Sequence, residues 1–262
     1  MSLQGKAAVI TGSTSGIGLA IAEALAAAGA NVLVNGLVAS PADDEAIADS
    51  LARKHGVKAI FHGADMRQPA QIAAMIDQAV ETFGSVDILV NNAGIQHTAP
   101  TEEFPLEQWD AIIAINLSAA FHASRAALPH MQRRGWGRII NTASVHGLVA
   151  SVHKAAYVAA KHGLVGLTKV IALENADKGV TCNAICPGWV DTPLIQQQIK
   201  DLATSEHISL DEGRRRLVGA KQPSQSFVQP EQIGALAVFL CSEAASQLTG
   251  AALPIDGGWT AQ

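Results

Sequence analysis

Residues 7–28 of the sequence read AAVITGSTSGIGLAIAEALAAA, and this stretch decides the fold. A short β-rich run leads through a glycine-rich turn, from Gly12 to Gly18, straight into an alanine- and leucine-rich helix pattern. Such a turn lets the backbone approach a pyrophosphate closely, and the helix N-terminus offers free N–H groups and a partial positive charge. The stretch predicts a phosphate-binding strand-turn-helix unit, although the same glycines could form an ordinary turn.

The rest of the chain continues this alternation of short β-rich runs and longer helical patterns. We expect strands at residues 7–11, 31–35, 57–62, 88–91, 138–142, 180–185 and 252–255. We expect helices at residues 17–28, 43–55, 72–83, 109–134, 155–177 and 231–241. Repeated βαβ units predict an α/β fold of the Rossmann type, a doubly wound, seven-stranded parallel sheet with helices on both faces.

One stretch, residues 192–229, departs from the alternation. It is polar, rich in Gln and charge, and follows the C-terminal end of a strand, so we predict a small helical lid over the site. No linker rich in Pro, Gly or Ser divides the chain, and no internal repeat is found. We therefore expect residues 1–262 to form a single domain.

Composition excludes several classes of partner. A net charge of -5 and a pI near 6.0 provide no basic field for nucleic acid. No uninterrupted apolar run approaches the ~20 residues that span a bilayer, and the N-terminus resembles no secretion signal. Cys182 and Cys186, read on one strand, would lie ~13 Å apart, beyond disulfide reach. We expect a cytoplasmic protein with reduced cysteines, no nucleic-acid partner and no membrane partner.

The residues after the second predicted strand bear on the choice of cofactor. NAD enzymes of this fold usually place an acidic residue there, whereas this chain has Asn35, Gly36 and Leu37. An NADP enzyme needs a cation for the extra phosphate, and residues 13–15 and 31–50 contain no Lys or Arg. This absence favours NAD. Asp65 and Met66 would contact the adenine, unless Asp65 is a solvated loop acid or a helix cap.

Four further features carry chemistry, and they occur in a fixed order. The segment Asn91-Asn92-Ala93-Gly94 follows the fourth predicted strand, Asn116 lies in a helix, Ser144 follows the fifth strand, and Tyr157 and Lys161 begin the next helix. With the GxxxGxG turn, this set resembles the short-chain dehydrogenase/reductase superfamily over essentially the whole chain. The resemblance implies a hydride-transferring oxidoreductase.

The residue types suit the oxidation of an alcohol, in which the hydroxyl proton is removed while the carbinol hydride leaves for a nicotinamide. Tyr157 is the candidate base, and Lys161, one helical turn away, would lower the pKa of its phenol. By the resemblance, Ser144 donates a hydrogen bond to the substrate oxygen and Asn116 holds a water that passes the proton onward. The alternative is that Tyr157 is a core aromatic residue and Lys161 a solvated charge.

The resemblance also implies a set of cofactor contacts around the crevice. They are Gly12, Thr14, Ser15, Gly16, Ile17, Gly18, Asp65, Met66, Asn92, Ala93, Gly94, Tyr157, Lys161, Pro187, Gly188, Val190 and Thr192.

Several polar residues near this machinery predict a pocket for a small carboxylate. Gln96 follows the NNAG segment, His146 follows Ser144, and Lys154 lies at i−3 from Tyr157, beside the base if the helix already includes it. His97 is a weaker candidate than Gln96. Without HExxH, CxxC or clustered carboxylates, a metal reading of the histidines has little support, and we predict no metal.

Further segments narrow the resemblance to the D-3-hydroxybutyrate dehydrogenases of bacteria. They are residues 92–99 (NAGIQHTA), 144–151 (SVHGLVAS), 221–224 (KQPS) and 256–261 (DGGWTA). This likeness implies that Gln96, His146, Lys154 and Gln198 bind the carboxylate, while Trp189 and Trp259 form apolar walls. The alternatives are a loop cap for His146, solvent exposure for Lys154 and Gln198, and a core or subunit contact for either Trp.

These expectations combine into an NAD-dependent enzyme that interconverts (R)-3-hydroxybutyrate and acetoacetate, with a small hydroxy acid as its partner. Two alternatives stay open: another short-chain dehydrogenase acting on a polyol or a 3-oxoacyl thioester, and a non-catalytic nucleotide-sensing protein. The likeness also implies a homotetramer packed through helices 109–134 and 155–177 and the C-terminal strand.

Overall fold

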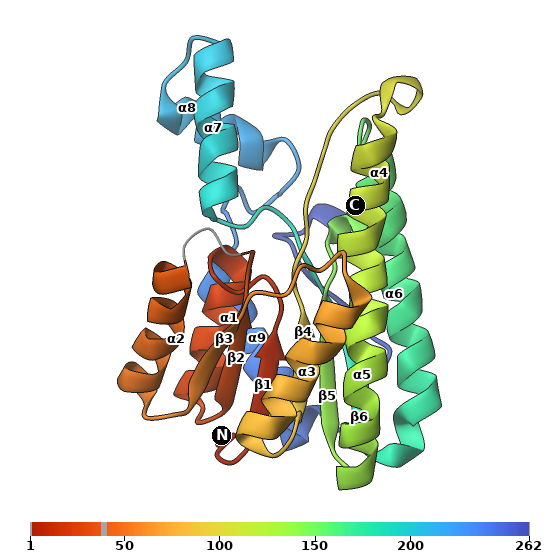
Figure 1. Ribbon diagram of the computed structural model, residues 1–262. Coiled ribbons are helices and arrows are strands. Elements are labelled where there is room, and N and C mark those ends of the chain that lie inside the picture. Colours follow the sequence, from red (N-terminus) through yellow and green to blue (C-terminus); the bar gives the residue numbers. More distant parts are fainter. Residues whose placement is uncertain (1, 38–40, 262) are drawn as a thin grey trace.

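The computed structural model describes residues 2–37 and 41–261, with the backbone alone at 41–44. In the described chain, seven strands form one sheet of order β3-β2-β1-β4-β5-β6-β7, and every neighbouring pair is parallel (Figure 1). The strands are β1 (Ala7–Ile10), β2 (Asn31–Asn35), β3 (Ala59–His62), β4 (Ile88–Asn91), β5 (Gly137–Thr142), β6 (Val180–Pro187) and β7 (Ala252–Ile255). The predicted doubly wound sheet is confirmed, and the strand order reverses between β1 and β4, where such sheets bind ligands.

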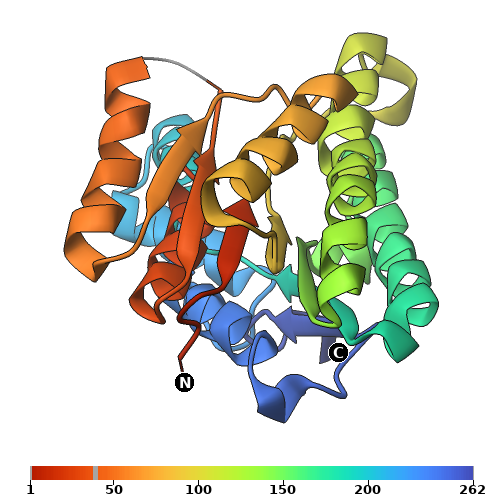
Figure 2. The same ribbon diagram turned by 60° about the horizontal axis from the view of Figure 1, so that its bottom comes forward.

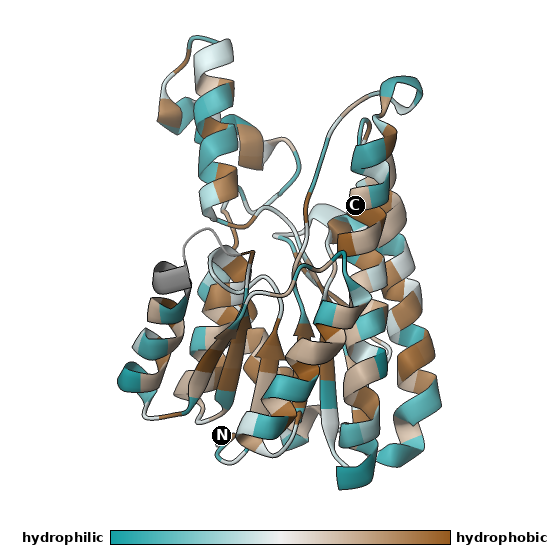
Figure 3. Cartoon of the chain, in the orientation of Figure 1, coloured by the Kyte–Doolittle hydropathy of each residue, from teal (hydrophilic) through white to brown (hydrophobic). Residues whose placement is uncertain are grey.

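Helices cover both faces of this sheet (Figure 2). They are α1 (Gly16–Ala27), α2 (Pro41–His55), α3 (Pro69–Phe83), α4 (Leu106–Ile113), α5 (Ala119–Arg134), α6 (Ala155–Asn175), α7 (Pro193–Ser205), α8 (Leu210–Gly219) and α9 (Pro230–Leu240). Ile10 packs in the cluster formed with α1 and α9, while its neighbour Val9 packs in the cluster formed with α3 and α5. Adjacent strand residues thus pack into opposite cores, and most strand residues are hydrophobic (Figure 3).

Three element boundaries differ from the sequence-based expectation and matter for the site. The helix expected at 109–134 begins at Leu106 and is interrupted by a π-helical turn, Ala114–Ser118. The helix expected at 155–177 ends at Asn175 and continues as a 3-10 turn, Ala176–Lys178. Strand β6 continues two residues beyond the expected end because its ladder with β7 reaches Ile255.

Two helical stretches, Leu106–Arg134 and Ala155–Lys178, are long and apolar enough to cross a bilayer. Both contribute buried residues to the clusters against the sheet, among them Ala123, Met131 and Ile171. Packing against the sheet buries part of their apolar surface, and other apolar residues of the two stretches, among them Leu106 and Leu173, are exposed.

The stretch predicted as a lid contains helices α7 and α8, which stand above the carboxyl ends of the strands (Figure 1). The pair has an apolar cluster of its own, formed by Ile195, Ile199, Val218 and Phe227, with Trp189 packed against it. An aspartate at its entrance, Asp191, forms a salt bridge with Arg214 of α8. The helical nature of the stretch agrees with the expectation, and its opening and closing stay a prediction.

Candidate active site

The glycine-rich turn and the NNAG segment are built against each other at the crevice between β1 and β4. Gly12 has a φ of +60°, and a Cβ there would lie 2.8 Å from the Cα of Ala93. The Asn92 amide donates to the carbonyls of Thr11 and Gly12 at 3.0 and 2.9 Å. Because no side chain caps the N-terminus of α1, the first backbone N–H groups of this helix stay available to an anion, whereas those of Gly12 and Ser13 donate to Asn35.

A cavity of about 390 Å³ extends from this turn toward the ends of β2 and β3. It is lined by eight of the predicted cofactor residues, of which Asn92 and Gly94 also line the next cavity: Gly12, Thr14, Ser15, Asp65, Met66, Asn92, Ala93 and Gly94. Gly18 contributes packing instead, because a Cβ there would collide with the Gly12 carbonyl and the Asn92 amide. The long, narrow succession of cavities fits an extended dinucleotide.

Asn35, which stands where an acid was expected, is a brace for the glycine turn. Its Oδ1 accepts from the Gly12 N–H at 3.1 Å, and its Nδ2 donates to the carbonyls of His62 and Ala64 at 2.9 and 3.0 Å. The side chain is 1% exposed. Sequence reasoning missed this role, because its bonds reach residues 23 to 29 positions away.

Asp65 lines the same cavity but is paired with Arg67. The guanidinium donates to both carboxylate oxygens, at 3.0 Å and 2.6 Å, and the Arg67 N–H donates to Oδ1 at 2.9 Å. This pairing lowers the pKa of the Asp65 carboxyl. The expected adenine contact therefore stays a prediction, and the alternative of a loop acid that braces its own turn has direct support.

Ser144, Tyr157 and Lys161 meet in a cavity of about 200 Å³ that also contains Pro187 and Gly188. Ser144 follows β5, and Tyr157 and Lys161 lie one turn apart in α6. Burial raises the pKa of the Tyr157 phenol, and a hydrogen bond from Ser144 opposes that rise. The candidate base and the candidate donor to the substrate oxygen thus face one space.

Lys161 was expected to lower the pKa of the Tyr157 phenol, but the main contact of its ammonium lies elsewhere. Its Nζ donates to the Thr142 carbonyl at 2.7 Å and lies 5.6 Å from the centroid of the Tyr157 ring. Burial lowers the pKa of the ammonium to about 8. In this arrangement Ser144 is the group that lowers the pKa of Tyr157, and Lys161 lies over the ring, held by the end of β5.

Asn116 lies in the π-helical turn and is 2% exposed. Its Oδ1 accepts from the Ile95 N–H and its Nδ2 donates to the Ile95 carbonyl, both at 2.9 Å. Each polar end of the side chain is therefore engaged with the segment after NNAG. The predicted role in holding a water stays a prediction.

A second cavity of about 140 Å³ adjoins the tyrosine and gathers most of the predicted substrate residues. Gln96, His146, Lys154, Trp189 and Trp259 line it together with Ser144 and Tyr157. The two indoles lie 5.8 Å apart, and the His146 ring makes edge-to-face contacts with Tyr157 and Trp259 at 5.9 and 5.6 Å. The cavity is small beside the ~300–1,000 Å³ usual for drug-sized ligands.

His146 is a neutral residue of this cavity at physiological pH. Burial, together with smaller effects of the nearby Lys154 and Lys221, lowers the pKa of its imidazole to about 4. The ring nitrogens lie 3.3 Å from the Ser144 hydroxyl and 3.0 Å from the Ser151 hydroxyl. His146 can therefore supply hydrogen bonds to a ligand but no positive charge.

Lys154 precedes α6 as its N-cap residue, because the helix begins at Ala155. The assumption that the helix includes Lys154 is wrong, yet the side chain still reaches the cavity beside Tyr157, with Nζ 5.5 Å from the Trp189 ring centroid. Burial lowers the pKa of this ammonium. Lys154 is the cation among the residues that line the smaller cavity.

Gln198 is not among the residues around this cavity. It lies half-buried on α7, and the same helix contributes Leu194 and Ile195 to the lining instead. An amphipathic helix pattern does not tell which turn faces a pocket, so these two apolar residues were missed. A carboxylate contact from Gln198 stays a prediction that requires α7 to move.

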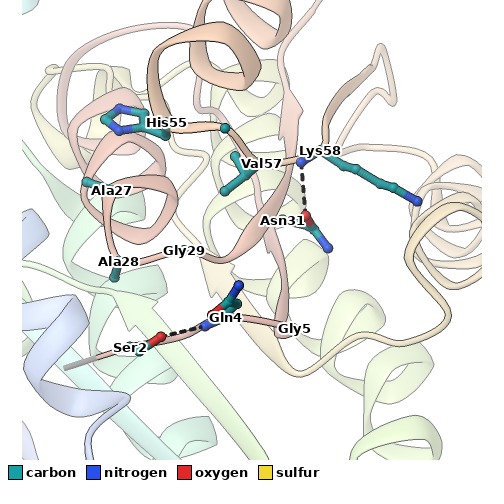
Figure 4. A pocket seen from close by; sticks show the side chains of 11 residues that line it. Ser2, Gln4, Gly5, Ala27, Ala28, Gly29, Asn31, His55, Val57 and Lys58 are labelled. Carbon is teal, nitrogen blue, oxygen red and sulfur yellow. Dashed lines mark hydrogen bonds between the residues drawn. The ribbon is translucent and has the colours of Figure 1, made fainter.

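Another cavity, of about 640 Å³, lies at the opposite end of the sheet (Figure 4). Its polar groups bond to one another: Asn31 accepts from the Lys58 N–H at 2.9 Å, and Ser2 accepts from the Gln4 N–H at 3.2 Å. Its His55 is paired with Glu23. Because no buried titratable group points into it, this cavity is a poor candidate for chemistry.

Comparison with known proteins is consistent with this geometry. The family profile described as short chain dehydrogenase matches residues 6–203. The D-beta-hydroxybutyrate dehydrogenases of Cupriavidus necator and Rhizobium meliloti are 59% and 52% identical, covering 99% and 98% of this chain and 100% and 99% of their own lengths. The L-sorbose reductase of Gluconobacter frateurii, solved with NADPH and L-sorbose, superimposes with a TM-score of 0.95 at 32% identity, covering 100% of this chain and 99% of that one.

Proposed function

Because this chain belongs to the short chain dehydrogenase family and is an oxidoreductase, we propose that it interconverts (R)-3-hydroxybutyrate and acetoacetate with NAD. The observation that carries this proposal is the small cavity beside Tyr157, in which one partly buried ammonium, Lys154, faces two indoles. A short molecule with a carboxylate at one end and a carbinol at the other matches that distribution of charge and apolar surface.

The chain's own residues suit a nicotinamide dinucleotide. The close contact of Gly12 with Ala93 leaves no room for a Cβ and holds the turn against the NNAG segment, and the uncapped N-terminus of α1 beside it suits a pyrophosphate. Bound NAD would supply a hydride acceptor and a positive charge near the base. Among the residues that the structure describes, no Lys or Arg lines the cavity near Gly36 and Leu37, and Arg67 is paired with Asp65, so they offer no free cation to a 2′-phosphate.

In the oxidation, Tyr157 takes the proton of the substrate hydroxyl as the carbinol hydride departs. Ser144 donates a hydrogen bond to the same oxygen and stabilises the charge that develops there. Lys161, anchored on the Thr142 carbonyl, keeps a positive charge over the phenol ring. Lys154, with neutral His146 and Gln96, holds the carboxylate and fixes the carbinol against the base.

A panel of substrates assayed with the purified protein tests this proposal. We expect reduction of NAD with (R)-3-hydroxybutyrate, far less with the S isomer, with polyols or with 3-hydroxyacyl thioesters, and a marked preference for NAD over NADP. Absence of turnover with every short hydroxy acid would reject the substrate. Equal use of NADP would reject the cofactor preference alone.

The exposed apolar side chains of α4, α5 and α6 support a homotetramer packed through these helices. Leu106 and Leu173 are 76% and 81% exposed, and Trp109, Phe121 and Val170 are also exposed. Apolar surface of this kind marks protein interfaces. Light scattering on the purified protein measures the assembly directly.

The three cysteines are free and buried, which suits a reducing compartment such as the cytoplasm.

A further inference from the structure

Gln222 is a fully buried amide outside the catalytic machinery, at 0% exposure just after α8. Its Oε1 accepts from the backbone N–H of Trp189, and its Nε2 donates to the Ser226 carbonyl at 2.6 Å. One end of the side chain must accept and the other must donate, which an amide does and an apolar or acidic side chain does not. The bonds join the end of β6 to the segment that leaves the lid.

The same amide is packed between two glycines. A Cβ at Gly188 would collide with its Oε1, and a Cβ at Gly257 would lie 3.1 Å from its Nε2. Gly188 directly precedes Trp189, and Gly257 lies two residues before Trp259. Gln222 thus lies where the backbones that carry both indole walls come together.

The Trp189 backbone is held from both sides by this return segment. Besides the bond to Gln222, its carbonyl accepts from the Val228 N–H at 2.9 Å. The indole, in turn, packs against the lid cluster, against Trp259 and beside Lys154. A shift of the backbone at Trp189 therefore moves one wall of the substrate cavity and leaves Tyr157, Ser144 and Lys161 in place.

We propose that Gln222 is a positioning residue that sets the Trp189 wall and thereby limits the chain length of the hydroxy acid. The inference rests on the proposed function, because it concerns the substrate cavity of that reaction. Its effect belongs in substrate binding and selectivity, since the amide touches neither the base nor the cofactor turn.

The experiment compares Gln222→Met, which removes both bonds at similar volume, with Gln225→Met, the same change at an exposed position of the same segment. With Gln222→Met we expect the KM for 3-hydroxybutyrate to rise at least about tenfold, with kcat within about threefold of wild type. Its kcat/KM preference for 3-hydroxybutyrate over 3-hydroxyhexanoate should fall at least about tenfold, the scale of misfitting methylenes. Gln225→Met should leave both quantities within about twofold.

Gln222→Glu keeps the acceptor for Trp189 and loses the donor to Ser226, so its selectivity should fall between wild type and Gln222→Met. If thermal unfolding and NAD affinity show that Gln222→Met does not fold, Gln222→Glu replaces it in the selectivity measurement. A chain-length preference within twofold of wild type in folded Gln222→Met, or in Gln222→Glu where that is the only variant that folds, overturns the proposal.

Failure of the proposed function is detected separately, as absence of turnover by the wild-type protein. In that case the tryptophan emission decides the inference. The Trp189 contribution, obtained by difference from Trp189→Phe, should shift in Gln222→Met and stay unchanged in Gln225→Met. If the Trp189 emission does not shift in Gln222→Met, the proposed role of Gln222 is overturned.

Discussion

Replacing Lys154 by Met isolates the charge that we propose holds the substrate carboxylate. The side chain is partly buried, its pKa is lowered by burial, and it is the cation lining the smaller cavity. Methionine keeps the unbranched apolar stem beside Trp189 and removes only the ammonium. The substitution therefore tests charge more than packing.

The expected magnitude follows from the partial burial of this ammonium. A hydrogen bond to a charged group contributes about 1.5–3 kcal/mol, and a Coulomb attraction of about 4 kcal/mol at ~4 Å and an effective dielectric constant of ~20 is an upper bound. Since about 1.4 kcal/mol is tenfold, KM for 3-hydroxybutyrate should rise about 10- to 150-fold. The kcat should change little, because Lys154 does not contact the reacting oxygen.

The assay is steady-state NADH formation with 3-hydroxybutyrate and with 2-butanol, which keeps the carbinol and lacks the carboxylate. The loss should appear with the acid and vanish with the alcohol. Lys221→Met is the matched control, because this exposed lysine influences His146 without lining the cavity, and it should change KM by less than about twofold. An unchanged KM, or an equal loss with 2-butanol, would refute the assignment.

The pH dependence of the same variant has a definite sign. The ammonium is charged below its lowered pKa, so wild-type affinity for the carboxylate should decline as pH rises through that pKa. In Lys154→Met this alkaline decline in affinity should disappear. This difference is tested by measuring the KM for 3-hydroxybutyrate across the alkaline range in the wild-type protein and in Lys154→Met.

Three further predictions address the base, the cofactor turn and the buried histidine. Tyr157→Phe should lower kcat about 10²- to 10⁴-fold with unchanged NAD affinity, and retained turnover would remove it as the base. Gly12→Ala, at φ +60° against Ala93, should destabilise by about 1–3 kcal/mol and weaken NAD binding, whereas Gly5→Ala, at φ +78° with open space, should leave NAD binding intact. Because the pKa of His146 is lowered from 6.5 to about 4, the unfolded chain binds the extra proton, and native stability should fall by up to about 3 kcal/mol as pH drops from 6.5 to 4. Denaturant unfolding of His146→Gln should lose that part of the pH dependence, and exposed His207→Gln should keep it.

Much of the site could be predicted because its parts follow strand ends. Residues such as Ser144 and the NNAG segment sit at the carboxyl ends of β5 and β4, and parallel strands bring those ends to one edge. Tyr157 and Lys161 share a helix face by spacing alone. The local pattern therefore predicted where the chemical groups lie, and the resemblance to the short-chain dehydrogenases implied their roles.

The details that the sequence left open depend on contacts between distant segments. Gln198 was expected at the substrate from the likeness to the bacterial dehydrogenases; Leu194 and Ile195 line the cavity from α7, and the contact of Gln198 stays a prediction. Lys161 was expected to act on the phenol, and its bond to Thr142, 19 residues away, holds it over the ring.

By itself, the sequence determined the α/β alternation, the glycine turn and the order of the catalytic groups, because periodicity and turn chemistry act over a few neighbouring residues. Only the tertiary structure decided which side chains share the smaller cavity, that burial lowers the pKa of His146 there, that Asn35 holds the glycine turn, and that Gln222 bonds to the Trp189 backbone. Burial and hydrogen bonding between residues far apart in the chain set those properties, and such distances exist only once the sheet has assembled.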